Sequence, residues 1–301
     1  MVRFGHNDFF KKEGCLMKNN PTKVLVTGAN GYIGHHVTNE LLKKEDLNVI
    51  AVDFSNKNIN DNAKYLNIDI LNNAESTDLY KNLDCPDNLI HLAWQDGFNH
   101  YAESHINNLI KHFNFLKNMI DSGVKSLTVM GTAHEIGYHE GRITENTPCN
   151  PLSYYGIAKN TLRQLLFAYA KDKDVSIKWL RAYYITGDDL NNHSVFTKLL
   201  EADNKGQKEF PFVKGTNQFD FIDINDLAEM IAKSALQNEV VGIINVCSGE
   251  PTSLKDKAEE FIKEHNLKIK LKCGVFPSRK YDSPVIYGDN EKILKILGAN
   301  K

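Results

Sequence analysis

Metal-binding cysteine pairs, membrane spans and a strong net charge are all missing from this sequence. The five cysteines are scattered and never stand in CxxC spacing, so neither a disulfide framework nor a metal site is expected. No apolar run approaches the roughly 18 residues of a membrane span, and the polar first 20 residues lack the apolar segment of a signal peptide. The formal net charge of −2 gives no electrostatic basis for binding nucleic acid or a membrane surface. These absences favour a cytoplasmic protein that holds any anionic ligand by local contacts.

The composition is that of a folded protein with a large core. Of the 301 residues, 42% are hydrophobic and 25% are charged, which suits one large domain or a nucleotide domain with a smaller lobe. Residues 1–21 show little pattern, and we expect them to form a disordered N-terminal extension. Translation could start at Met17 instead of Met1.

Three glycines between an apolar segment and a helical pattern are the most informative feature. Residues 24–27 read as a strand that runs directly into Gly28, Gly31 and Gly34. Without a Cβ, these glycines permit a tight turn, let a pyrophosphate approach the backbone and let the next helix pack close to the strand. The helix N-terminus would face the phosphates with its partial positive charge. This order predicts a dinucleotide site, and a plain glycine-rich turn is the alternative.

A second predicted strand ends in an acid at a suitable distance from these glycines. Residues 49–52 are apolar and lead to Asp53, 25 residues after Gly28. A carboxylate there can accept hydrogen bonds from the hydroxyls of an adenosine ribose. It would also repel the extra phosphate of NADP, so we expect NAD(H) to be preferred. Lys57 lies nearby and keeps NADP(H) as the alternative cofactor.

Strands and helices alternate through the first two thirds of the chain. Further strands are expected at 65–69, 88–93, 126–130 and 175–181, and helices at 73–83, 101–121 and 155–171. The alternation predicts an α/β fold with a Rossmann-type doubly wound parallel sheet, whose ligands bind beyond the carboxyl ends of the strands. We expect an NAD-binding domain over 22–187 and a small C-terminal substrate-binding lobe over 188–301. Within that lobe, 219–247 would return to the Rossmann sheet.

Two residues on the helix expected at 155–171 can carry acid–base chemistry. Tyr155 and Lys159 are four apart, so they lie on one face of the helix. A nearby positive charge, together with an oxidised nicotinamide ring, favours phenolate and would lower the pKa of the tyrosine. Thr132 follows a buried strand. Its hydroxyl can hydrogen-bond the same substrate oxygen with which Tyr155 would exchange a proton. The alternatives are two surface residues on an ordinary helix and a threonine that caps a turn.

Taken together, these elements resemble the extended short-chain dehydrogenase/reductase family, in its NAD-dependent epimerase/dehydratase group. The resemblance covers essentially residues 22–299. Its motifs are TGANGYIG at 27–34, Asp53, Asp69-Ile70, His91-Leu92-Ala93, Thr132 with Gly137, Tyr155 with Lys159, Asp220-Phe221-Ile222-Asp223 before Asp226, and Asp289.

The resemblance implies roles for individual residues. Thr132, Tyr155 and Lys159 would be catalytic, and Tyr155 and Lys159 would also bind the cofactor, the lysine at the nicotinamide ribose. The other implied cofactor-binding residues are Gly28, Asn30, Gly31, Tyr32, Ile33, Gly34, Asp53, Asp69, Ile70, Leu92, Ala93 and Asn108. Of these, Asp69 and Ile70 would flank the adenine, Ala93 would back the cofactor, and Asn108 would lie in the helix that supports the catalytic lysine.

Departures from the family bear on the substrate. The sugar 4,6-dehydratases carry Thr-Asp-Glu where this chain has Thr132-Ala133-His134, so the elimination machinery is missing. His134 and Glu135 would either line the sugar pocket or act only as turn residues. Tyr184 replaces an asparagine that often touches the substrate in this family.

Two residues of the expected C-terminal lobe are further candidates for substrate binding. Arg279 is the best candidate for the sugar nucleotide's pyrophosphate, because a guanidinium binds phosphate through two hydrogen bonds; a solvated side chain is the alternative. Phe212 would stack on the nucleotide base or pack within its own lobe.

The resemblance leads to three hypotheses of function. We favour an NAD(P)H-dependent reductase of an NDP-4-keto-6-deoxyhexose, such as dTDP-4-dehydro-6-deoxyglucose, in deoxysugar synthesis for surface polysaccharide. The alternatives are an NDP-sugar 4-epimerase with tightly bound NAD and a non-catalytic dinucleotide-binding regulator. Many family members dimerise, and the resemblance implies a homodimer formed through the helices near 101–121 and 155–171.

Overall fold

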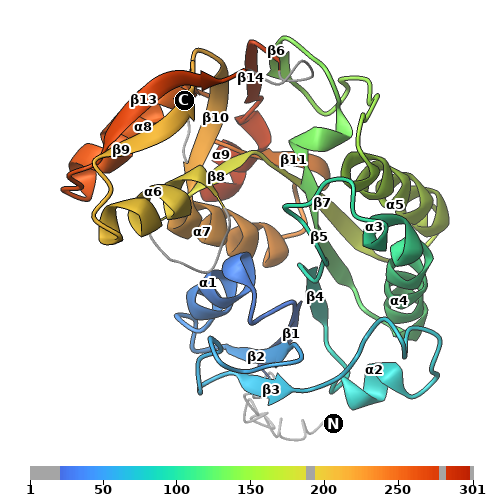
Figure 1. Cartoon of the computed structure of the whole chain (residues 1–301). Coiled ribbons are helices and arrows are strands. Elements are labelled where there is room, and N and C mark those ends of the chain that lie inside the picture. The colour runs from blue at the N-terminus through green and yellow to red at the C-terminus, as the bar shows by residue number, and fades with distance from the viewer. Residues whose placement is uncertain (1–20, 188–193, 278–282, 299–301) are drawn as a thin grey trace, which may run out of the picture.

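A seven-stranded parallel sheet forms the centre of the molecule (Figure 1). The computed structural model describes residues 21–187, 194–277 and 283–298; the expected N-terminal extension lies almost entirely outside them. From edge to edge, the strands are β11 (Gly242–Val246), β7 (Ser176–Ala182), β5 (Ser126–Thr132), β4 (Asn88–His91), β1 (Thr22–Thr27), β2 (Leu47–Val52) and β3 (Lys64–Leu66). This order confirms the predicted Rossmann-type fold.

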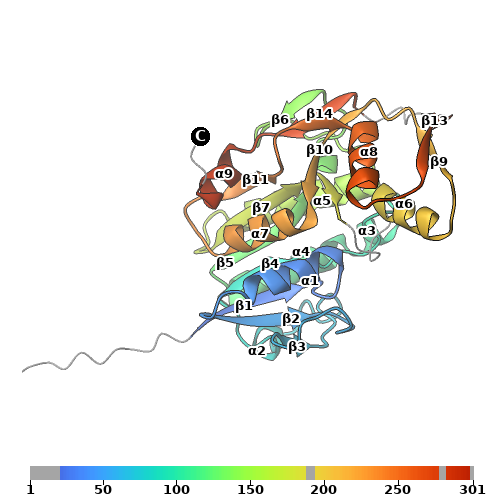
Figure 2. The same cartoon turned by 90° about the vertical axis from the view of Figure 1, so that its left-hand side faces the viewer.

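Helices cover both faces of this sheet, which explains why its strands are apolar on both sides. Along β1, Val24 and Val26 face one core cluster and Leu25 faces the other. The first cluster is closed by α1 (Tyr32–Leu41), α7 (Ile224–Ala235) and α9 (Glu291–Leu297). The second is covered by α2 (Leu79–Asn82), α4 (Leu109–Ser122) and α5 (Tyr154–Ala170), with α3 (Ser104–Asn107) alongside (Figures 1 and 2).

Two predicted helices differ from the structure. The helix expected at 73–83 shrinks to α2, because Asp69 accepts hydrogen bonds from the N–H groups of Leu71 and Asn72 and so stabilises a turn instead. The helix expected at 101–121 is divided into α3 and α4, with Asn108 between them.

A smaller lobe lies beyond the carboxyl ends of the large sheet (Figure 2). It contains a sheet of β12 (Pro251–Ser253), β10 (Gln218–Asp223), β14 (Val285–Gly288) and β6 (Gly141–Ile143), with β8 (Tyr184–Thr186) paired to β10. A second sheet pairs β9 (Glu209–Val213) with β13 (Lys270–Phe276), and α6 (Val195–Asn204) and α8 (Leu254–Glu264) complete the lobe.

The segment 219–247 returns to the large sheet only in part. Helix α7 packs on the large sheet and β11 forms its edge, whereas β10 belongs to the small lobe. No helix in the described ranges has the length and apolarity to cross a membrane.

Candidate active site

Three glycines bring β1, α1 and the end of β4 into close contact. Gly28 has a φ of 72°, and a Cβ there would lie 2.7 Å from the backbone nitrogen of Ala93. A Cβ on Gly34 would lie only 2.0 Å from the carbonyl oxygen of Gly28. Gly31 caps α1 without any side-chain hydrogen bond, and the first turn of that helix has no acidic residue. The N–H groups and partial positive charge of this helix end are therefore available to an anion.

Asp53 lies beside this loop, at the end of β2. Its carboxylate accepts hydrogen bonds from the N–H of Asn30 at 3.0 Å and of Phe54 at 2.7 Å. Asn30 is fixed in turn by Asn58, whose N–H donates to its side-chain oxygen at 2.8 Å. Asp53 therefore lies beside the glycine loop, where a ligand bound by the loop would be within its reach.

The remaining predicted cofactor residues lie around the same edge. Tyr32 and Ile33 open α1 and pack against its core cluster, and Leu92 and Ala93 follow β4. Asp69 caps the turn described above, and Ile70 is buried in the second cluster. Asn108 precedes α4, the helix that packs against α5, and its amide donates to Gln95 Oε1 at 3.3 Å.

Thr132, Tyr155 and Lys159 meet between β5 and α5. Ser153 caps α5 by accepting a hydrogen bond from the N–H of Gly156, which starts the helix directly before Tyr155. Tyr155 faces Thr132 at the end of β5, close enough for the Thr132 side chain to lower the pKa of the phenol. The Lys159 ammonium is buried one turn further on and donates to the carbonyl of Met130 at 2.8 Å.

Burial controls the protonation of these groups. It lowers the pKa of Lys159 to about 7, although the Glu135 carboxylate acts in the opposite direction. Burial also raises the pKa of Tyr155 to about 12, against the effect of the Thr132 side chain and with a smaller contribution from Glu135. The expected lowering, which Lys159 and an oxidised nicotinamide ring would produce together, stays a prediction for the coenzyme-bound enzyme.

Sequence reasoning missed a cluster of rings around Tyr155. The Lys159 ammonium lies 3.8 Å from the centre of the Trp94 ring, and Trp94 stacks on His112 with centroids 4.4 Å apart. His100 stacks on Tyr155 at 5.2 Å, and His105 lies 5.3 Å from it. The place of Trp94, directly after Ala93 at a strand end, was a usable signal. The loop that carries His100 has no pattern that could have revealed it.

Two buried histidines connect this cluster to the glycine loop. His91 Nδ1 lies 2.8 Å from the hydroxyl of Thr27, and its Nε2 lies 3.0 Å from His112 Nδ1. Burial, reinforced by Lys159, lowers the pKa of His112 to about 3, and that of His91 falls well below its usual value. Both rings are therefore neutral hydrogen-bonding links, and His112 in turn stacks on Trp94.

A pocket opens beside Thr132 and faces the small lobe. Three of the candidates for substrate contact, Thr132, His134 and Tyr184, line it together with His100, Phe219 and Ile286. Phe212 does not reach it: the ring is 3% exposed and belongs to the core of the small lobe. Arg279 lies outside the described residues. Within the described ranges, no group of three metal-ligating side chains is present.

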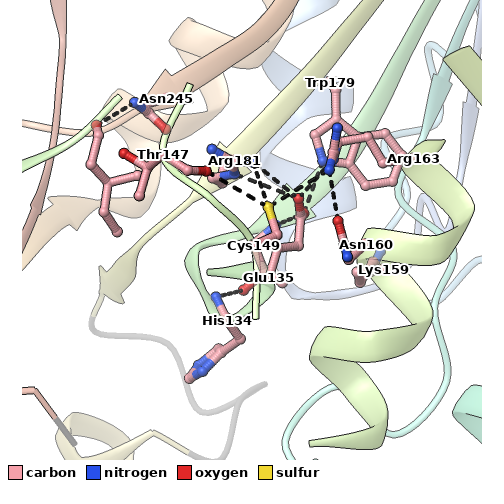
Figure 3. A network of polar contacts seen from close by, with 12 residues as sticks. His134, Glu135, Thr147, Cys149, Lys159, Asn160, Arg163, Trp179, Arg181 and Asn245 are labelled. Atoms are coloured by element: carbon pink, nitrogen blue, oxygen red, sulfur yellow. Dashed lines mark hydrogen bonds and ion pairs between the residues drawn. The ribbon is translucent and has the colours of Figure 1, made fainter. Parts of the chain in front are cut away.

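Glu135 also does not line the pocket, which corrects the sequence interpretation. Its side chain is fully buried below the turn Ala133–Glu135 and points at Trp179, Arg163 and Arg181 (Figure 3). The spacing of Thr132 and Glu135 matches a capping box, and both reciprocal hydrogen bonds are present. That spacing was the sequence signal for a carboxylate turned back toward the chain.

The glycine loop, the acid after β2 and the tyrosine–lysine pair define a dinucleotide-dependent oxidoreductase site. The model of the NAD dependent epimerase/dehydratase family matches residues 24–247, and the chain belongs to that family. The predicted class of NAD(P)-dependent enzyme is thereby confirmed.

Individual relatives narrow the comparison. The dTDP-6-deoxy-L-talose 4-dehydrogenase (NAD(+)) of Aggregatibacter actinomycetemcomitans is 48% identical over 271 residues, covering 88% of this chain and 98% of that protein. UDP-arabinose 4-epimerase 1 of Arabidopsis thaliana is 27% identical over 320 residues, covering 92% and 74%. The solved structure of the UDP-glucuronic acid 4-epimerase from Bacillus cereus, in complex with UDP-glucuronic acid and NAD, matches with a TM-score of 0.76 at 24% identity, covering 93% and 94%. This last likeness supports the fold.

Proposed function

We propose that this protein interconverts a hydroxyl and a ketone at C4 of a nucleotide-linked 6-deoxyhexose, with NAD(H) as its coenzyme. The observation that carries the proposal is the meeting of Thr132, which lines the pocket, with Tyr155, while Lys159 lies one helical turn away. The 48% identity to a dTDP-6-deoxy-L-talose 4-dehydrogenase favours a dTDP-linked substrate. Reduction of the corresponding 4-keto sugar is the same reaction in reverse.

The residues present fit the coenzyme. The uncapped N-terminus of α1 suits a pyrophosphate, and the Cβ-free surface of Gly28 and Gly34 keeps the strand, helix and Ala93 in contact below it. Asp53 would accept the hydroxyls of the adenosine ribose and disfavour a phosphate there, so NAD(H) is preferred over NADP(H). Lys159 would hold the nicotinamide ribose. When bound, the coenzyme supplies or accepts the hydride at C4.

Acid–base work at the sugar oxygen then falls to the protein. In reduction, the Tyr155 hydroxyl donates its proton to the C4 oxygen, and in oxidation the phenolate removes it. Thr132 hydrogen-bonds the same oxygen and restrains the phenol. The phenol, whose pKa is raised, is held in the protonated form that reduction requires. The apolar pocket residues Tyr184, Phe219 and Ile286 suit the C6 methyl group of a deoxysugar.

A 4-epimerase with tightly bound NAD is the second candidate, because it needs the same three catalytic residues and because UDP-arabinose 4-epimerases are among the relatives. The two functions differ in coenzyme use. We expect the purified protein to consume NADH in proportion to added dTDP-4-keto-6-deoxyhexose. Conversion of a dTDP-6-deoxyhexose into its C4 epimer without added coenzyme would contradict the proposal.

We also propose a cytoplasmic homodimer formed through α3, α4 and α5. The leucines on the predicted interface mostly serve the monomer, since Leu116, Leu162 and Leu166 are completely buried. Other apolar side chains on these helices are exposed instead, namely Ile106, Ile110, Tyr154 and Ile157. Light scattering should give twice the chain mass, and Ile110→Asp should reduce it to the chain mass.

A further inference from the structure

Glu135 is a buried carboxylate that the proposed reaction does not use. One carboxylate oxygen accepts hydrogen bonds from the N–H of Thr132 and from the indole N–H of Trp179, each at 2.8 Å. The other lies 3.4 Å from Nε of Arg163 and 3.5 Å from Nε of Arg181 (Figure 3). Glu135 and Arg181 have no exposed side-chain surface, so both charges are held away from water.

These partners come from the elements that carry the catalytic residues. Thr132 ends β5, whereas Arg163 lies on α5, one turn after Lys159 and two turns after Tyr155. Arg163 is also bonded to Asn160 on its own helix, at 2.7 Å. The carboxylate therefore joins the strand that ends in Thr132 to the helix face that presents Tyr155.

The chain makes room for this contact. A Cβ on Gly131 would lie 2.6 Å from Glu135 Oε1 and 2.2 Å from Trp179 Nε1, so only glycine fits between them. A buried carboxylate cannot replace a lost partner by hydrogen bonds to water, so any movement away from its partners is costly. Its position is therefore rigid. The stiffness is transmitted directly to the Thr132 main chain through the 2.8 Å hydrogen bond.

We propose that Glu135 is a positioning residue, which holds the Thr132 hydroxyl in register with Tyr155 through Arg163. The inference rests on the proposed function, because it assigns Glu135 a task in that same acid–base step. Glu135 touches neither the pocket nor the reacting atoms, so it acts only through Thr132 and Tyr155.

A double-mutant cycle tests this role. Glu135→Gln keeps an oxygen acceptor for Thr132 but removes the charge that Arg163 and Arg181 require. We expect kcat to fall by about 10- to 100-fold, with KM nearly unchanged. In a Thr132→Val background, where the positioned hydroxyl is gone, the same change should cost less than about 2-fold. Equal losses in the two backgrounds would overturn the proposal.

A second variant covers the case in which Glu135→Gln does not fold. Arg163→Met cuts the link to α5 but leaves Glu135 paired with Arg181, so the buried charges stay balanced. It should reproduce the fall in kcat and its disappearance with Thr132→Val. Arg142→Met is the matched control, because Arg142 pairs with Asp289 and Glu291 on the surface. A similar kcat loss in the control would point to a general effect of removing an arginine and would contradict the inference.

Crystal structures of the unmutated protein and of Arg163→Met separate this inference from the proposed function. If the unmutated enzyme turns over none of the sugars, the proposed function fails, and the structures alone decide the role of Glu135. We expect the distance between the Thr132 and Tyr155 hydroxyl oxygens to increase from the unmutated protein to the variant. An unchanged distance would overturn the positioning role.

Discussion

The adjacent strands β5 and β7 lie close to a buried lysine at each of their two ends, and the two lysines have different surroundings. At the carboxyl end, Lys159 donates to the Met130 carbonyl, lies over the Trp94 ring and feels the charge of Glu135. Toward the amino end, Lys178 donates to Ser126 Oγ and Asn238 Oδ1, both at 2.7 Å. Among the described residues, Lys178 has no ion pair.

Burial lowers the pKa of both lysines, to about 7 for Lys159 and about 8 for Lys178, so a shifted pKa does not identify a functional site by itself. What distinguishes Lys159 is its place: Tyr155 lies one turn earlier on the same helix and faces Thr132, which lines the pocket. Lys178 is completely buried, and its ammonium hydrogen-bonds only the polar atoms of Ser126 and Asn238 among the described residues. The comparison predicts that one lysine serves turnover and the other only stability.

The largest effect on turnover should come from replacing Tyr155, which lies one helical turn before Lys159. Tyr155→Phe removes the proton donor, and turnover should fall by roughly 10² to 10⁴ while NADH binding stays near normal. Tyr169→Phe is the matched control on the same helix, since its hydroxyl donates to Asp121 far from the pocket. Steady-state turnover with saturating coenzyme measures both. More than a tenth of the original turnover in folded Tyr155→Phe would remove the tyrosine from its role.

Replacing each lysine by methionine tests the comparison directly. Lys159→Met should lower turnover by roughly 10² or more and weaken NADH binding, because the proposed function gives the ammonium two tasks, at Tyr155 and at the nicotinamide ribose. Lys178→Met should leave turnover within about 2-fold, as expected of a site remote from the chemistry. Kinetic assays and NADH fluorescence titration give the two quantities. A comparable loss of turnover in both variants would make the distinction wrong.

A smaller effect, on the choice of coenzyme, is expected from replacing Asp53 at the end of β2. Asp53→Ala removes the carboxylate beside the glycine loop, so the preference for NADH over NADPH should narrow by about 10-fold or reverse. Asp61→Ala serves as the control, because Asp61 is an exposed acidic residue eight positions further along the chain. Dissociation constants of both coenzymes are measured for each protein. Equal affinities in the unmutated protein would contradict the role of Asp53.

The parts of this site that depend on local pattern were predictable from the sequence. The glycine spacing, the acid after β2 and the four-residue spacing of Tyr155 and Lys159 each specify a local geometry, and the structure places them at one edge. Glu135 was misassigned because its partners Arg163 and Arg181 come from later parts of the chain, and only tertiary folding brings them together. Phe212 was misassigned because the core of the small lobe is built from short segments without clear periodicity.

The smallest effect concerns the stability of the fold and comes from Lys178, toward the amino ends of β5 and β7. Burial lowers the pKa of Lys178 from its ordinary 10.5 to about 8 in the folded protein. Between these values the unfolded chain binds more protons than the folded one, so this group makes stability rise with pH from about 8 to 10.5. Lys159 contributes in the same direction, and subtracting the Lys178→Met variant isolates Lys178. Urea unfolding at pH 8, 9 and 10 should show the unmutated protein gaining stability relative to that variant.

Lys173→Met is the control, because the pKa of Lys173 is raised by Asp121 and no gain in stability is expected from it. Parallel pH curves for the unmutated protein and Lys178→Met would mean that Lys178 is as well solvated as a surface lysine, and the contrast between the two ends of the sheet would lose its physical basis.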